Sequence, residues 1–327
     1  MKLRIFMHTM PWEIDSALSM SERLRRCSYY LQAGDEVRLD FIMNLSDAII
    51  DWDKSELDKQ FFIDKFNSLE KLNNWSDYNS RIYEGDEVWG HLDAFRDVVN
   101  DDYECDAYVS LSPNTSFHNS LLYYVFRSIE GINHDYYWIN PQVVKLWDES
   151  WDVLVNDHYM SVPYDKHESI DYHTIEKVVN DNLNDVQLIE NTNYLTYHSP
   201  YYKWAGWFDV HSSKLFDLIM YPDHWKGYGP MDSFFIKLLS YIKDSPMDDK
   251  INFKQYIIRN QIVQSGDQFD INRSVYEDRL VLKNQRGKQR KKIYETWEDD
   301  MLDWMNKFTE SHGYSTKSTT KKTGEIR

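Results

Sequence analysis

The sequence predicts an α/β protein built on a doubly wound sheet. Three observations at the start of the chain support this. Residues 3–9 form an apolar run typical of a buried strand, residues 16–31 carry apolar side chains at helical spacing, and residues 37–45 alternate as a second strand. A strand–helix–strand start is typical of sheets with helices on both faces.

The first helix is expected to bury one face. Leu18, Leu24, Tyr29 and Leu31 lie at the spacing that would form this face, and the turn at 33–35 ends the helix. The second strand alternates between apolar and other side chains from 37 to 43, as a strand does when its two faces differ.

The later elements follow the same mixed pattern of strands and helices. We expect helices at 56–72, 88–99 and 117–129, strands at 107–111 and 136–144, and a strand with a short helix at 206–216. Residues 73–85 are expected to form a polar loop, and 165–193 a peripheral acidic excursion with a helical segment at 174–180. Residues 256–263 fit a strand or a helix equally well.

Composition bounds the class of protein. The 327 residues are 42% hydrophobic, which is enough for a substantial core, and the net charge of −17 does not steer the whole protein toward DNA or an anionic membrane. Two cysteines form neither a disulfide framework nor a metal pattern. No signal peptide or membrane-spanning run is evident in the sequence, so a cytoplasmic location without membrane contact is predicted.

The chain changes character after residue 275. Residues 283–292 carry six Lys or Arg in an otherwise acidic protein, 294–309 has the pattern of an acidic amphipathic helix, and 312–327 is rich in Ser, Thr and Lys. We therefore divide the chain into a domain at 1–275 and a C-terminal helical and basic extension at 276–327. The basic run is either a solvated loop or a contact for phosphate groups.

Two neighbouring segments carry the strongest functional pattern. The strand and helix at 206–216 are followed by Gly227 and Gly229, then by Asp232 and an apolar helix. Glycines allow the backbone to approach a ligand closely. A carboxylate at the start of a helix either caps backbone amides or faces a pocket, so Asp232 is a candidate for both roles.

This pattern resembles the acceptor half of a GT-A glycosyltransferase, similar to family 2. The resemblance implies a Rossmann-like N-terminal half, a mixed sheet, and transfer of a hexose or pentose from a nucleotide sugar to a hydroxyl. It implies that Asp232 is the base if configuration is inverted, and that it orients the sugar if configuration is retained. The residues that it places along the sugar and acceptor sites are Gly206, Trp207, Asp209, Gly227 and Gly229.

The resemblance also points to a metal site, in which this chain departs from the pattern. GT-A enzymes bind a divalent ion through Asp-x-Asp at the end of a central strand, and here the matching positions are Ser112 and Asn114. A Mn or Mg ion is therefore held elsewhere, or the enzyme needs none, or the segment is only a helix-capping turn. Asn114 and His211 are candidate ligands, although His211 equally fits a structural role.

The donor is expected at the carboxyl ends of the first strands. The polar members of the loop after the first strand, and those that close the second strand, are the candidates; turn chemistry explains the second group almost as well. With the two positions at the metal motif, the predicted donor-binding residues are Thr9, Glu13, Asp15, Asn44, Ser46, Asp47, Ser112 and Asn114.

Two other functions remain open from the sequence. The composition, rich in Asn, Asp, Tyr and Lys, suggests an AT-rich genome such as that of a bacteriophage, which would place the protein in the host cytoplasm. The acceptor would then be a hydroxymethylated base in DNA, contacted through residues 283–292. Alternatively, Ser112 and Asn114 favour a non-catalytic protein that binds nucleotide sugars or glycans.

Overall fold

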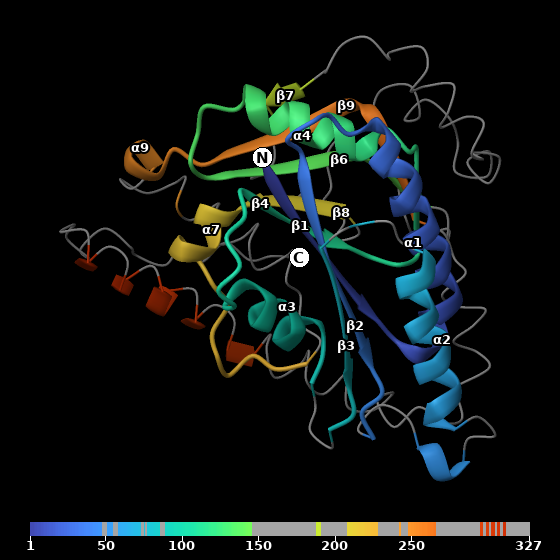
Figure 1. The fold of residues 1–327 in the computed structure, drawn as a ribbon. Helices are drawn as coiled ribbons and strands as arrows, with labels where there is room; N and C mark the ends of the chain where they lie inside the picture. The colour runs from blue at the N-terminus through green and yellow to red at the C-terminus, as the bar shows by residue number, and fades with distance from the viewer. Residues whose placement is uncertain are drawn as a thin grey trace.

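The computed structural model shows an α/β protein with one mixed sheet (Figure 1). It describes residues 1–47, 51–54, 58–72, 75, 77–85, 89–145, 188–190, 208–227, 242 and 248–265, together with scattered positions between 295 and 311. Across these residues the sheet has nine strands in the order β3-β2-β1-β4-β8-β6-β9-β5, with β7 paired to β9.

The N-terminal half is parallel, as the sequence predicts. Strand β1 pairs with β2 on one side and with β4 on the other, and β3 pairs with β2. The chain therefore moves outward in one direction and then crosses to the other side of β1, which makes this half Rossmann-like. The strands are β1 (Lys2–Thr9), β2 (Glu36–Asn44), β3 (Asp77–Tyr83) and β4 (Ala107–Leu111).

The second half makes the sheet mixed. Strand β8 is antiparallel to both β4 and β6, so β6 again runs in the direction of β1. Strand β9 is parallel to β6, and the two short strands β5 and β7 are antiparallel to β9. These strands are β5 (Thr115–Phe117), β6 (Tyr137–Lys145), β7 (Leu188–Glu190), β8 (Phe208–Ser212) and β9 (Lys254–Ser265).

Helices cover both faces of the sheet (Figure 1). The larger layer consists of α1 (Ile14–Cys27), α2 (Lys59–Leu72) and α4 (Leu121–Gly131). The opposite face carries α3 (His91–Val99) and α7 (Ser213–Leu218), and α9 (Asp248–Ile251) precedes β9. Single turns of 3₁₀ helix occur at Pro11–Glu13, Ser28–Tyr30 and Trp52–Lys54.

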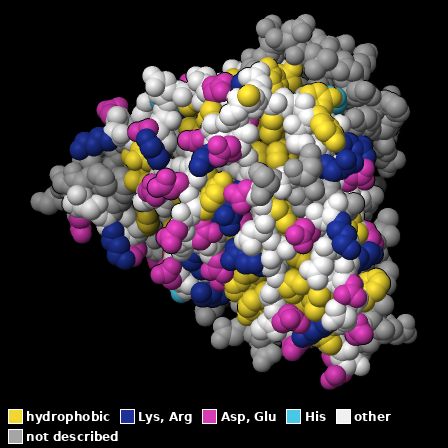
Figure 2. Space-filling model, in the orientation of Figure 1, with side chains coloured by type: hydrophobic (Ala, Val, Ile, Leu, Met, Phe, Trp, Pro, Cys, Tyr) yellow, Lys and Arg dark blue, Asp and Glu magenta, His cyan; other side chains and the backbone are white. Residues whose placement is uncertain are grey.

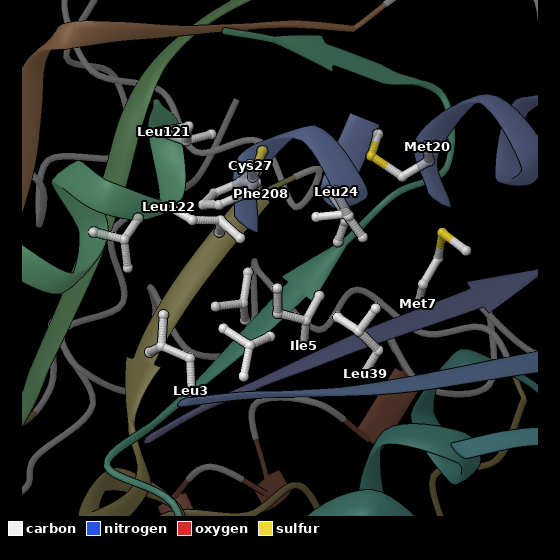
Figure 3. Close-up of a cluster of buried hydrophobic side chains, with 14 of the residues drawn as sticks. Leu3, Ile5, Met7, Met20, Leu24, Cys27, Leu39, Leu121, Leu122 and Phe208 are labelled. Carbon is white, nitrogen blue, oxygen red and sulfur yellow. The ribbon is translucent and has the colours of Figure 1, made fainter. Parts of the chain in front are cut away.

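The face under α1, α2 and α4 is apolar. Leu3, Ile5 and Met7 of β1 point into it with the alternate residues of β2, β4 and β8, and all three are fully buried. Figure 3 shows these side chains meeting Leu24 and Cys27 of α1. We call this surface the apolar face. Burial of such side chains is the main stabilising term in folding, at about 25 cal/mol for each Å² removed from water.

Three expectations about the elements need correction, and one open alternative is resolved. The expected loop at 73–85 contains the edge strand β3, whose half-buried Tyr78 and Ile82 pack on the core while its other face is polar. The untyped segment 256–263 lies in strand β9. The helix expected at 117–129 begins only at Leu121, because Thr115–Phe117 pairs with β9 instead. The first α-helix ends at Cys27, and a 3₁₀ turn carries the chain through Tyr30.

Part of the chain lies outside the described residues. This holds for the helical segment at 174–180, the basic run at 283–292 and the tail at 312–327. Of the acidic excursion, only β7 is described. The described positions between 295 and 311 are helical, in line with the helix expected at 294–309. No helix among the described residues is long and apolar enough to cross a membrane.

Candidate functional site

The sheet has a point at which the strand order reverses direction. It lies between β1 and β4, because β2 and β3 extend the sheet on one side of β1 whereas β4 and β8 extend it on the other. In open α/β sheets, ligands bind outside the carboxyl ends of the strands at such a point. The carboxyl ends concerned are Thr9 of β1 and Leu111 of β4.

Two hydroxyl groups at this point are buried without a described partner. Thr9 and Ser110 are fully buried, and neither Thr9 Oγ1 nor Ser110 Oγ forms a hydrogen bond with any described residue. Buried polar atoms in native proteins almost always have partners, so exceptions call for a ligand, a water or a neighbouring segment. The two side chains point to opposite faces of the sheet, because Ser110 pairs with Phe6 and Thr9 lies three residues further along β1, so each is a separate polar position near the carboxyl edge.

The loops that follow β1 and β4 are joined across this point. Glu13 Oε2 accepts a hydrogen bond from the Met10 backbone N–H at 2.9 Å, and its Oε1 accepts one from Asn114 Nδ2 at 3.1 Å. The Thr115 hydroxyl donates to the Ser112 carbonyl at 2.8 Å, which closes the turn after β4. Glu13, Ser112 and Asn114, all predicted donor-binding residues, thus come together, and Glu13 connects the two loops.

An aromatic group stands beside these loops. The Trp89 ring stacks on Tyr83 at the end of β3, with centroids 4.5 Å apart and planes 17° apart. His8, near the end of β1, has its ring 5.9 Å from Trp89 and 5.8 Å from His91. Sequence reasoning missed this group, which we call the aromatic edge. The sequence feature that could have revealed it is the Trp-Gly-His run at 89–91, which lies between a strand and a helix.

Both histidines of the aromatic edge are held neutral. Desolvation lowers the pKa of His91 to about 4. The pKa of His8 is also well below its ordinary value, first because the ring is buried and then because His91 lies near it. A neutral imidazole donates one hydrogen bond and accepts another, so the edge offers stacking surfaces and polar groups without a net charge.

The remaining predicted donor residues lie in two different settings. Asn44 is fully buried; its Nδ2 donates to the Trp89 carbonyl at 2.7 Å and its Oδ1 accepts from the Ser46 N–H at 3.1 Å. It therefore fixes the aromatic edge in place. Asp15 and Asp47 instead lie on the surface, where they form ion pairs with Lys65 at 2.5 Å and Lys59 at 2.6 Å on α2.

Gly227, the first glycine of the tandem pair, allows two backbone segments to approach each other closely. Gly227 has a φ of 77°, and a Cβ atom at Gly90 would lie 2.6 Å from its carbonyl. The Gly227 N–H donates to Asp93 Oδ2 at 2.6 Å, and its carbonyl accepts from the Leu92 N–H at 3.1 Å. The close approach expected toward a ligand is made here to the start of α3. The glycine loop therefore begins directly beside His91.

Asp209 lies in a buried polar row on the same face as Ser110. It is fully buried and is paired with Ser110 across β4 and β8. Its Oδ1 accepts hydrogen bonds from Asn140 Nδ2 at 2.6 Å and from Trp138 Nε1 at 3.3 Å, and Gln255 Nε2 donates to Asn140 Oδ1 at 3.1 Å. The row extends the polar character of the switch point toward β9.

His211 lies away from this edge. It pairs with Tyr108 near the start of β4, and its ring is 4.6 Å from Trp138 and 5.4 Å from Phe216. Burial lowers its pKa to about 3, so the ring is neutral at ordinary pH. Aromatic neighbours of this kind fit the structural alternative for His211.

The described side chains do not fit a divalent metal ion. Such ions need several oxygen or nitrogen ligands, usually with carboxylates among them. Among the described residues, no three His, Cys, Asp or Glu side chains gather as a group that could hold a metal. Asn114 presents a buried Oδ1 with no described partner, but the nearby Glu13 carboxylate is already hydrogen-bonded through both oxygens. No chemical step is therefore derived through a metal here.

Four predicted site residues fall on parts of the chain that are not described. They are Gly206, Trp207, Gly229 and the catalytic candidate Asp232. The described chain reaches Phe208 on one side of this region and Gly227 on the other. Their roles remain predictions, and the nearest described contacts are those of Gly227 and Asp209.

Comparison with known proteins gives only remote similarity. No protein-family model matches the chain, and no curated protein matches its sequence. Among solved structures, S. aureus TarS has 9% identity and a TM-score of 0.46 over 83% of this chain, which spans only 38% of TarS. TarS 1-349 in complex with UDP-GlcNAc has 12% identity and a TM-score of 0.42, covering 82% of this chain and 59% of that one.

A third structure is similar at the same level. GalNAc-T7 with UDP, GalNAc and Mn²⁺ has 12% identity and a TM-score of 0.44, covering 81% of this chain and 43% of that one. Similarity this low leaves function to be argued from the residues of the site itself. What the structure establishes is an α/β chain whose mixed sheet brings the buried Ser110 hydroxyl and an aromatic edge to the side of its switch point.

Proposed function

We propose that this protein is a glycosyltransferase that moves a sugar from a nucleotide-sugar donor to a hydroxyl acceptor. The observation that carries the proposal lies near the switch point: the buried Ser110 hydroxyl, Asp209 and His8 of the aromatic edge share one face of the sheet, toward the carboxyl ends of β1 and β4. A nucleotide sugar needs both a stacking surface for its base and hydrogen-bonding groups for its sugars.

The base of the donor is assigned to the aromatic edge. Trp89 is partly exposed, is stacked on Tyr83 and is anchored through its carbonyl by Asn44. An aromatic ring held in this way loses little freedom when a base stacks on it, and such stacking contributes about 1–3 kcal/mol per base. The neutral His8 and His91 avoid placing a full charge beside the base.

The transferred sugar is assigned to the polar row that starts at Asp209. Buried carboxylates and amides that are already oriented by one another bind sugar hydroxyls without reorganising, and Asp209 is oriented by Asn140 and Trp138. The acceptor approaches from the glycine loop, which leaves the start of α3 at Gly227. Glu13, Ser112 and Asn114, which hydrogen bonds join across the two loops, are assigned to the floor between the base and the sugar.

Asp232 is proposed as the group that deprotonates the acceptor. It lies five residues beyond Gly227 in the chain, and a general base at this position would raise the rate about 10²–10⁴-fold. Changing Asp232 to Asn should therefore lower transfer by this factor while donor affinity is kept. Donor affinity is measured by calorimetry and transfer by release of the nucleoside diphosphate. Unchanged turnover in this variant would remove Asp232 as the base.

Donor binding is tested first, because every later step depends on it. The native protein is titrated with a panel of nucleoside diphosphates and their sugar conjugates, and ligand binding is followed by the rise in thermal stability. Changing Trp89 to Leu should weaken the best ligand about tenfold or more, because the stacking surface is lost. The matched control is Tyr29→Leu, an aromatic side chain that is 71% exposed at the end of α1, which should bind normally.

If no nucleotide of the panel binds, the proposal fails. Equal weakening by both aromatic substitutions would also count against it, because the effect would then not be local to the aromatic edge. The same titration is repeated with and without manganese. It tests whether residues that the structure does not describe form a metal site. Dependence of affinity on manganese would place an ion near the diphosphate.

A non-catalytic binding protein is the second candidate function. The observation in its favour is at the end of β4, where Ser112 and Asn114 form a hydrogen-bonded turn at the positions of the expected carboxylates. Such a protein would bind the nucleotide sugar and release it unchanged. Binding without turnover, across a range of hydroxyl acceptors and metals, would favour this function over transfer.

A DNA-binding test distinguishes the two classes of acceptor, which are a hydroxymethylated base in DNA and a hydroxyl group of a glycan or protein. On the face shown in Figure 2, acidic and basic side chains alternate without a continuous basic stripe. Transfer to a hydroxymethylated base would need such a surface, supplied by residues 283–292. Filter binding of duplex DNA should then weaken steeply with salt. Absence of binding at low salt would leave a glycan or a protein hydroxyl as the acceptor.

A further inference from the structure

The loop that leads into the glycine pair is held at several points along its length. Arg96 of α3 donates through Nη2 to the Pro222 carbonyl at 3.0 Å and to the Trp225 carbonyl at 3.2 Å. At the other end, Asp93 accepts from the Gly227 N–H. The loop 222–227 is therefore fixed on α3 by backbone contacts at both of its ends.

A distant part of the chain holds the same loop through its side chains. Asp300, in the C-terminal extension, accepts a hydrogen bond from Trp225 Nε1 at 2.8 Å through Oδ2, and His224 Nε2 lies 3.2 Å from the same oxygen. The Asp300 side chain is only 16% exposed, so water screens these contacts little. The indole of Trp225 is fully buried, which leaves no water to replace this partner.

Packing reinforces this contact. Trp304, four residues after Asp300, lies against the cluster that contains Trp225, Phe95 and Tyr221. On a helix, residues four apart share a face, so Asp300 and Trp304 approach the loop together. In Figure 1 the C-terminal segment passes beside α3 and α7, on the face of the sheet that carries the polar row.

We propose that the C-terminal extension sets the position of the glycine loop, and that Asp300 is the positioning residue that does so. In the sequence, Gly229 and the proposed base Asp232 follow this loop within five residues, so a displaced loop is expected to slow transfer. The role in catalysis rests on the proposed function. The anchoring of the loop does not, and it is testable in the protein without any substrate.

The first experiment measures hydrogen exchange in the full-length protein. The variant Asp300→Leu removes the acceptor, whereas Asp300→Asn keeps an oxygen that accepts from the indole. We expect exchange of the Trp225 and Gly227 amides to accelerate about tenfold in the leucine variant and much less in the asparagine variant, since a lost buried hydrogen bond has an effect of this size. The control is Asp303→Leu, whose exposed carboxylate pairs only with Lys307 among the described contacts.

The second experiment measures transfer. In the leucine variant we expect kcat to fall about tenfold with little change in the donor KM, because Asn44 holds the Trp89 carbonyl independently of Asp300. Partial recovery in the asparagine variant would identify the hydrogen bond as the cause. A fall in donor affinity instead would indicate general disruption and would overturn the positioning role.

The outcomes separate the two proposals. Faster exchange in a protein that binds no nucleotide would keep the anchor and reject the proposed function. Unchanged exchange at Trp225 and Gly227 would reject the anchor, whatever the activity. The thermal stability of each variant is measured alongside. Trp225→Phe provides a second route: it keeps an aromatic ring at this position and removes the indole N–H donor, so it should reproduce the faster exchange at Gly227.

Discussion

The two faces of the sheet are built in different ways, although the same strands form both. The apolar face presents Leu3, Ile5 and Met7 to helices α1, α2 and α4. The opposite face, which we call the polar face, presents Arg4, Phe6 and His8 from the same strand. Apolar burial stabilises the apolar face, whereas the polar face combines a second cluster of apolar side chains, which includes Phe6 and Phe95, with buried polar groups that need partners.

The contrast is strongest at Arg4. This arginine is fully buried within β1; its Nε donates to Asp40 Oδ2 at 2.7 Å, its Nη1 donates to the Val98 carbonyl at 2.7 Å, and its guanidinium also pairs with Asp101. Burial raises the pKa of Asp101, but hydrogen bonds from Arg4 and the Tyr103 N–H outweigh it, and the pKa lies below its ordinary value. Through these contacts a buried charge of β1 joins β2 to the end of α3 and the residues after it, a specific pairing that apolar burial alone does not provide.

The largest expected difference between the two faces is in how much stability each loses at acidic pH. His8, His91 and His211 all lie on the polar side, and the pKa of each is lowered, to about 4 for His91 and about 3 for His211. An unfolded histidine binds its proton near pH 6.5, so between pH 6.5 and 4 the unfolded chain binds more protons than the folded one. The free energy of unfolding should therefore decrease as the pH is lowered through this range, by about 1.4 kcal/mol per pH unit for each histidine.

Urea unfolding at several pH values between 7 and 4 measures this slope. The variant His211→Leu removes one of the three groups and fills a site beside Trp138 and Phe216. It should lose less stability over this range than the unaltered protein. An identical slope in the two proteins would show that the histidine at 211 does not contribute to the acid response.

The next largest effect is expected from Arg4→Leu. The substitution leaves the carboxylate of Asp40 buried without its main partner, which should lower the free energy of unfolding by about 3–5 kcal/mol. Replacing both residues, as Arg4→Leu with Asp40→Leu, should restore part of this loss, because an apolar pair leaves no uncompensated charge. The comparison on the apolar face is Leu39→Ala, at a cost of about 2–5 kcal/mol without any such rescue.

The smallest effect is expected from Asp15→Asn. This carboxylate is 66% exposed and pairs with Lys65 on the outer surface of α2, away from both faces of the sheet. Exposed pairs contribute little, so the free energy of unfolding should change by less than about 0.5 kcal/mol. Nucleotide affinity, measured by calorimetry, should stay the same. Weaker nucleotide binding in this variant would indicate that Asp15 contacts the donor.

The sequence predicted the elements whose pattern is local. Strands β1 and β4 are apolar runs, and α1 and α3 have one apolar face each, so their residues alone indicate them. Strand β3 was missed because it is an edge strand, and an edge strand with one polar face resembles a loop. Strand β9 was left undecided, and three of its residues bulge between the pairs Pro141–Ile258 and Gln142–Ile262.

The sequence predicted where in the sheet the candidate site lies better than it predicted the contacts of each side chain. Carboxyl ends of parallel strands meet at one edge, so Thr9, Glu13 and Asn44 were placed there by topology alone. The partners of each side chain depend on segments far away in the sequence. Pairing of Glu13 with Asn114, and of Trp89 with Tyr83, appears only once the chain has folded. The surface pairs of Asp15 and Asp47 with lysines were missed for the same reason.

The contact between Gly90 and Gly227 has a consequence for tracing the ancestry of the chain. A methyl group at position 90 would meet the backbone of 227 at 2.6 Å, and a φ of 77° at 227 disfavours any side chain there. Each glycine thus restricts substitution at both sites, although the two lie 137 positions apart in the sequence. Distant sequences that retain this pair, whatever else has diverged, are the ones in which the same crossing of loop and helix should be sought.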